Sequence, residues 1–134
     1  MKKLIFVFVT GLFLVSCSKK EVSSPGAANQ SVFFKNANVL VENLQATQIS
    51  SNAVALSFST AYENNIKRIE LMSSANASTF CSIEGENVDG NSANVQAHSF
   101  QDTNLKGSTM FYMLRFQDNL GNWTYSNYYT VSVH

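Results

Sequence analysis

The stretch from Phe111 to Val133 alternates large apolar side chains with polar ones on two arms that flank a turn. A period of two places successive side chains on opposite faces of a β-strand, so each arm is predicted to be a strand. The turn, residues 118–122, holds Asp and Asn side chains that can bond the local backbone, and Gly121 can take a positive φ. The stretch therefore predicts a long β-hairpin. A lone hairpin is marginally stable in water, so one face must be covered by a second sheet.

The same alternation assigns the hairpin side chains to two faces. The face that packs on the core is predicted to hold Tyr112, Leu114, Phe116, Trp123, Tyr125, Tyr129, Val131 and Val133. The opposite face is predicted to hold Phe111, Met113 and Tyr128. Trp123 is the single Trp of the chain, and we expect its loss from the core to destabilise the domain severely.

The first residues are predicted to form an export signal. Met1-Lys2-Lys3 is basic, the run from Leu4 to Leu14 is apolar, and Leu14-Val15-Ser16-Cys17 follows it. The run is too short to span a bilayer comfortably and has the flanks of a secretory signal. Leu-Val-Ser-Cys resembles the lipobox of bacterial lipoproteins, in which a peptidase cuts before a Cys whose thiol carries a diacylglyceryl group. The alternatives are an ordinary signal peptide with an incidental Cys, or an anchor helix.

The lipobox resemblance implies three segments and a location. Residues 1–16 would be a cleaved lipoprotein signal peptide, residues 17–30 an acylated Cys17 with a flexible tether, and residues 31–134 the folded domain. Several acyl chains would hold the protein on a membrane without a spanning helix. Ser18 stands where an Asp resembles an inner-membrane retention signal in Gram-negative lipoproteins, so the resemblance implies the outer membrane. Lys19-Lys20-Glu21 resembles weakly the tethers that direct some lipoproteins to the cell exterior.

The rest of the chain reads as short strands joined by polar turns, without helical periodicity. Residues 54–58 alternate in the manner of a half-buried antiparallel strand, and residues 84–94 are polar and rich in Gly, Asn and Asp, as long loops are. Residues 31–34 could begin a first strand or cap the structure. About seven strands with turns every ~8–12 residues predict an all-β, antiparallel β-sandwich of the immunoglobulin or fibronectin type III kind.

Several motifs resemble a pattern of fibronectin type III-like domains in bacterial surface and secreted proteins. The matching segments are Val54-Ala55-Leu56-Ser57-Phe58-Ser59-Thr60, Glu63-Asn64-Asn65, Ile69-Glu70-Leu71, His98-Ser99-Phe100-Gln101-Asp102 and Phe111-Tyr112-Met113-Leu114-Arg115-Phe116-Gln117-Asp118. The resemblance covers roughly residues 39–133. It departs from the pattern at Phe58, where the family has Trp, at Ala77, where it has a turn Gly, and at His98, where it has Tyr. It implies that Tyr112 is a tyrosine-corner residue bonded to the backbone near residues 105–107; a plain core Tyr is the alternative.

The residues of this chain give little indication of an active site, a metal site or a nucleic-acid-binding surface. Lys plus Arg and Asp plus Glu balance at nine each, which argues against a nucleic-acid binder. Beyond the signal, the histidines are His98, expected to be a satisfied strand residue, and His134 at the terminus. The acidic residues Glu84, Glu86 and Asp89 lack the ligand register of an EF-hand. We therefore expect no enzyme activity, no catalytic residue, no cofactor and no metal site.

Cys81 is the second Cys of the chain, and acylation of Cys17 would leave it without a partner. An exposed free thiol is a liability in an oxidising envelope, so we expect Cys81 to be buried as a small apolar residue.

The remaining functional candidate is an aromatic surface formed by Phe111, Met113 and Tyr128. Such a row could contact another protein or stack on a sugar, or it could lie beneath residues 31–34. The leading hypothesis is a non-enzymatic, lipid-anchored surface protein that mediates protein–protein contacts or adhesion, with an envelope or extracellular protein as its partner. The alternative is a small carbohydrate-binding surface lipoprotein. Folds of this class host many functions, so the fold does not decide between them.

Overall fold

A computed structural model describes residues 17–19 and 32–134. The predicted signal peptide, residues 1–16, and most of the predicted tether lie outside the described residues. Residues 17–19, which the sequence assigns to the tether, form a short strand. Within the described ranges, no helix is long and apolar enough to cross a membrane.

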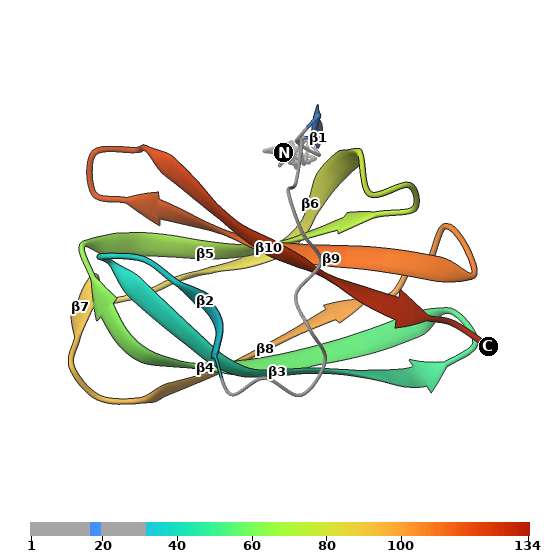
Figure 1. The fold of residues 1–134 in the computed structure, drawn as a ribbon, viewed down its shortest axis with the longest axis horizontal. Coiled ribbons are helices and arrows are strands. Elements are labelled where there is room, and N and C mark those ends of the chain that lie inside the picture. Colours follow the sequence, from blue (N-terminus) through green and yellow to red (C-terminus); the bar gives the residue numbers. More distant parts are fainter. Residues whose placement is uncertain (1–16, 20–31) are drawn as a thin grey trace, which may run out of the picture.

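Two antiparallel sheets face each other as layers (Figure 1). The hairpin sheet has the strand order β1 (Cys17–Lys19), β6 (Thr79–Asn87), β5 (Ile66–Ser74), β9 (Thr109–Asp118) and β10 (Trp123–Ser132). The facing sheet has the order β2 (Val32–Lys35), β3 (Val39–Ser50), β4 (Ala53–Asn64) and β7 (Asn91–Ser92), and β8 (Gln96–Asp102) also pairs with β4. The prediction of an all-β, antiparallel sandwich is confirmed at this level.

The core lies between the two sheets. It takes the alternate side chains of the long strands because the period of two turns one set inward from each sheet. The ring of Phe34 stacks on that of Phe116, with centroids 5.9 Å apart. The buried core residues are Phe33, Val39, Val41, Leu44, Val54, Leu56, Phe58, Ile66, Ile69, Leu71, Phe100, Met110, Tyr112, Leu114, Phe116 and Val131.

The sequence allowed residues 31–34 to begin a first strand or to cap the structure, and residues 32–35 form a strand. They form β2, which pairs with β3 at an edge of the facing sheet, so they are a first strand. The buried Phe33 belongs to the main core. Residues 32–34 therefore do not cover the outer face of the hairpin sheet, which was one of the alternatives.

The predicted hairpin is confirmed as β9 and β10. Asp118 organises the turn: its Oδ1 accepts the backbone N–H groups of Leu120 and Asn122 at 2.8 and 2.9 Å. Gly121 has a φ of 90°, the left-handed conformation that glycine adopts without a Cβ penalty. The turn chemistry read from residues 118–122 is therefore correct.

A β-bulge between Tyr125 and Tyr128 changes the facial assignment of β10. Before the bulge Tyr125 stands opposite Arg115, whereas after it Tyr129 stands opposite Tyr112. A register shift of one residue moves every side chain on one side of it to the other face. The prediction that Trp123 and Tyr125 share the core face with Tyr129 is therefore wrong, because these two residues lie on the outer face.

Candidate functional site

The outer face of the hairpin sheet carries a second apolar cluster, separate from the sandwich core. Its buried base consists of Met72 from β5, Phe80 from β6 and Met113 from β9. Three half-buried rings pack on this base. We call the whole set the outer aromatic cluster: Met72, Phe80, Met113, Phe111, Tyr125 and Tyr128.

The rings of this cluster come from β6, β9 and β10 and lie close to one another across the sheet. The rings of Phe111 and Tyr128 meet edge to face with centroids 5.6 Å apart, and Phe80 lies 6.4 Å from Tyr128. Edge-to-face pairs add to the energy of apolar burial. The expectation that Phe111, Met113 and Tyr128 share one face is confirmed. The expectation that Met113 is exposed is wrong, because it is 1% exposed beneath the rings.

A charged group adjoins the outer aromatic cluster on the same face. Glu70 on β5 accepts from Arg68 Nε at 2.7 Å and from the Ser82 hydroxyl at 2.8 Å. Its Oε2 also accepts from Arg115 on β9, with Nε at 2.7 Å and Nη2 at 2.5 Å. Burial alone would raise the pKa of Glu70, but the bonds from Arg68, Ser82 and Arg115 hold that pKa below its ordinary value. Glu70 is therefore a fixed anion that orients both arginines.

Gly85 on β6 makes room for this charged group. A Cβ at residue 85 would lie 2.6 Å from Arg68 Nη2 and 2.7 Å from Glu70 Cγ. Such distances are shorter than van der Waals contacts, so any side chain there would displace the Arg68–Glu70 pair. Glycine at this position leaves the space that the Arg68 guanidinium occupies.

Trp123 lies half-buried beside the charged group rather than in the core. The guanidinium of Arg115 sits over its ring, 4.1 Å from the ring centroid. Cations in this position are attracted by the negative face of an indole. The prediction of a core Trp123 is wrong because the bulge after Tyr125 turns the Trp123 side chain to the outer face of the hairpin sheet.

Tyr112 is buried, as both readings of the sequence required, but its partner is a side chain. Its hydroxyl donates to Oδ2 of Asp102 at 2.9 Å, and Asp102 Oδ1 accepts the N–H of Asn104. Burial raises the pKa of the Tyr112 phenol, and the bond to Asp102 raises it further. The expectation of a bond to the backbone near residues 105–107 is therefore wrong. The partner of the phenol is therefore a carboxylate at the end of β8.

Cys17 and Cys81 form a disulfide that joins β1 to the edge strand β6. In this structure Cys81 is paired, whereas the expectation of an unpaired Cys81 applies to a chain acylated at Cys17. The side chain of Cys81 is half-buried, so the expectation that it is buried is wrong. Acylation would use the same sulfur of Cys17. The disulfide and the thioether are therefore mutually exclusive fates of this residue.

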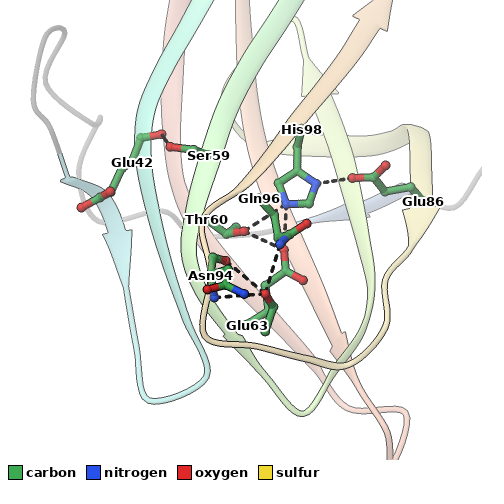
Figure 2. A network of polar contacts seen from close by, with 9 residues as sticks. Glu42, Ser59, Thr60, Glu63, Glu86, Asn94, Gln96 and His98 are labelled. Carbon is green, nitrogen blue, oxygen red and sulfur yellow. Dashed lines mark hydrogen bonds and ion pairs between the residues drawn. The ribbon is translucent and has the colours of Figure 1, made fainter.

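A second group of polar side chains surrounds His98 at the open edge where β6 and β8 meet (Figure 2). His98 Nε2 lies 2.7 Å from Glu63 Oε1 and 3.0 Å from Thr60 Oγ1, while Nδ1 faces Glu86 Oε1. The ring of Phe58 stacks on the imidazole at 5.0 Å. The expectation of a satisfied His98 is confirmed. No residue pattern indicated the partners, because Thr60 and Glu63 reach His98 through the pairing of β4 with β8, and Glu86 reaches it from the other sheet.

This group resembles a hydrolase triad in composition but not in access. Thr60 is fully buried and donates its hydroxyl to Glu63 at 2.6 Å, so the oxygen is neither free nor reachable by a substrate carbonyl. The prediction that residues 84–94 form one loop is wrong, because β6 extends to Asn87 and β7 covers Asn91–Ser92. Glu84 lies on β6 and accepts the N–H of Gln101 instead of bonding His98. Among residues 17–19 and 32–134, no three His, Cys, Asp or Glu side chains are arranged to hold a metal ion.

No known family model, no curated protein and no solved structure matches this chain.

Proposed function

We propose that this protein is a non-enzymatic, lipid-anchored binding module of the bacterial cell envelope, which contacts a protein partner through the outer aromatic cluster. The carrying observation is the cluster itself, six large side chains gathered on the face of the hairpin sheet that points away from the sandwich core. A sandwich already has a core between its sheets, so a second apolar group on an outer face is what a contact surface requires.

The cluster has the anatomy of a protein-binding surface. Aromatic side chains are enriched at interfaces, and the half-buried rings of Phe111 and Tyr128 supply them here, supported by the buried Met113. The buried base of Met72 and Phe80 holds the half-buried rings in place, so little side-chain entropy is lost on binding. The fold that presents this surface is proposed to be fibronectin type III-like.

The lipid anchor rests on the lipobox-like Leu14-Val15-Ser16-Cys17. In this proposal Cys17 carries the lipid on the outer membrane, with the domain free to face the periplasm or the exterior. The Cys17–Cys81 disulfide is then the state of a chain that has escaped acylation, since one sulfur cannot form both bonds.

A carbohydrate ligand is the second candidate, and Trp123 is the observation that favours it. Its ring is half-buried with a guanidinium against it, so the remaining indole surface could stack on a pyranose. In that case Trp123 and not Phe111 would dominate the affinity.

The test combines cross-linking on intact cells with a pair of variants. The Phe111→Ser, Tyr128→Ser double variant should weaken capture of the partner at least tenfold, because loss of an aromatic anchor costs about 2 kcal/mol or more. The matched control is Val95→Ser, Leu120→Ser, which removes two apolar side chains that are 67% and 84% exposed outside the cluster. Denaturation of both variants separates binding from folding. Equal capture by the double variant and the control would overturn the proposal.

A glycan array with the same proteins distinguishes the second candidate. Protein contact predicts no glycan signal from the wild-type chain. A glycan signal that Trp123→Ala removes and Phe111→Ser retains would replace the protein partner with a carbohydrate.

A further inference from the structure

His98 joins the two sheets at their open edge. His98 and Glu63 belong to β8 and β4 of the facing sheet, whereas Glu86 belongs to β6 of the hairpin sheet. Figure 2 shows the imidazole between the two carboxylates, with the Glu86 side chain reaching across from the neighbouring sheet. The contact therefore closes a gap between layers that backbone hydrogen bonds do not span.

The hydrogen-bond geometry defines the proton content of the ring. A carboxylate can only accept, and each ring nitrogen faces one: Nε2 faces Glu63 and Nδ1 faces Glu86. Both nitrogens must therefore donate, so the imidazole is the cation. Burial would lower the pKa of His98, but the bonds to Glu63 and Glu86 raise that pKa above its ordinary value of 6.5. Asp89, in the loop after β6, lines the same cavity and adds negative charge.

The two carboxylates differ in what they lose when the ring becomes neutral. The Glu63 side chain is 3% exposed and accepts a second bond from Thr60, so water cannot replace the His98 bond. The Glu86 side chain is 41% exposed. A buried carboxylate left unpaired is far more unfavourable than one that water can solvate. The proton that leaves is therefore the one on Nδ1.

We propose that His98 is a pH-dependent clamp: the protonated ring ties β8 to β6 through Glu86, and the neutral ring releases Glu86 while it keeps its bond to Glu63. With the clamp closed, a polar cavity of about 300 Å³ already lies between β6, the loop after it and β8, with Glu63, Glu86 and Asp89 in its wall, and release of Glu86 would widen it. Alkaline conditions thus open this edge of the sandwich and acidic conditions close it.

A neighbouring bond supplies the matched control. Glu84 Oε2, also on β6, accepts the backbone N–H of Gln101 on β8 at 2.6 Å. That bond joins the same two strands without contact to His98. This bond should persist whether His98 is protonated or neutral. It should therefore keep the Glu84 end of β6 joined to β8 while the Glu86 end is released from β8.

Nitrogen NMR of the imidazole on the full domain tests the clamp directly. His98 should titrate above 6.5, and its neutral form should carry the proton on Nε2; Nδ1 protonation of the neutral ring would overturn the proposal. Because the chain has two histidines, His134→Gln assigns the signals. Amide-exchange protection factors of residues 86–88, corrected for intrinsic rates, should fall as pH rises through this titration.

Variants separate the clamp from a purely structural carboxylate. Glu86→Gln should lower the pKa of His98 and make protection of residues 86–88 independent of pH, with the fold retained because this side chain is partly exposed. Glu84→Gln should leave the titration of His98 unchanged, and protection of residues 86–88 should still fall as pH rises. Protection that does not vary with pH in the wild-type chain, or that Glu84→Gln flattens as much as Glu86→Gln does, would overturn the clamp.

Discussion

The guanidinium carbon of Arg115 lies 4.1 Å from the centroid of the Trp123 ring, on the outer face of the hairpin sheet. The same guanidinium bonds Glu70, so a carboxylate on β5, an arginine on β9 and an indole on β10 run across three adjacent strands. The single Trp of the chain is therefore half-buried on an outer face. Its replacement should destabilise the protein less than replacement of a core Trp would.

Trp123→Ala should lower the free energy of unfolding by about 1–2 kcal/mol, which combines a cation–π contact with partial burial. A core Trp would lose about 3–5 kcal/mol. Urea denaturation measures the difference. Trp123→Phe keeps a ring over Arg115 and should lose less than the Ala variant; a loss of 3 kcal/mol or more from Trp123→Ala would return this residue to the core.

Tyr112→Phe should lower the free energy of unfolding by about 1–3 kcal/mol, because Oδ2 of the buried Asp102 then lacks its donor. The double variant Tyr112→Phe, Asp102→Asn removes the charge together with the donor. In a thermodynamic cycle the two substitutions should therefore be less than additive. Strict additivity in chemical denaturation would mean that the hydroxyl and the carboxylate do not interact.

Ala77→Gly should stabilise the protein by about 1 kcal/mol. Ala77 has a φ of 58°, where a Cβ is strained and glycine is not. Ala75 belongs to the same loop and is not among the residues with positive φ, so Ala75→Gly should destabilise slightly through greater unfolded-state entropy. Thermal melts of the two variants should shift in opposite directions, and a common downward shift would contradict the strain argument.

Stability should depend on pH through His98 and Glu63 with opposite signs. The pKa of His98 is raised, so its contribution is complete below 6.5 and is lost as pH rises through the folded-state value. Burial would raise the pKa of Glu63, but bonds to His98 and Thr60 lower it below 4.5, so its contribution is complete above 4.5 and is lost as pH falls. The free energy of unfolding should therefore fall on both the acidic and the alkaline side and reach its maximum between them. His98→Gln should flatten the alkaline limb of a urea-denaturation series, and an unchanged limb would exclude His98 as its source.

Cys17 decides between an anchored and a disulfide-linked protein. In membranes from cells fed labelled palmitate, Cys17→Ala should abolish labelling of the chain, whereas Cys81→Ser should leave labelling intact. In the acylated protein the Cys81 thiol should react with a maleimide under denaturing conditions without a reductant. Labelled protein whose Cys81 requires reduction first would contradict the proposed use of the Cys17 sulfur.

The local sequence pattern was sufficient to predict the strands and the hairpin of this structure. The period of two predicted strands, and the Asp-Asn-Leu-Gly-Asn turn between Asp118 and Asn122 predicted the hairpin, because both depend on residues a few positions apart. The face shared by Phe111, Met113 and Tyr128 followed from the same period. The inward facing predicted for Trp123 failed because nothing in residues 125–128 distinguishes a bulge from regular alternation.

The sequence by itself determined that this chain forms antiparallel strands, where its hairpin turns and which residues of β9 face outward, since backbone sterics and apolar periodicity act locally. Only the tertiary structure decided the partners of its buried charges. Glu63 meets His98 across 35 residues and Arg115 meets Glu70 across 45, and such pairs depend on strand order and register. The Cys17–Cys81 pairing, with a sequence separation of 64, belongs to the same class. Contacts of that length arise only when strands far apart in the sequence become neighbours in a sheet, and no short sequence pattern predicts them.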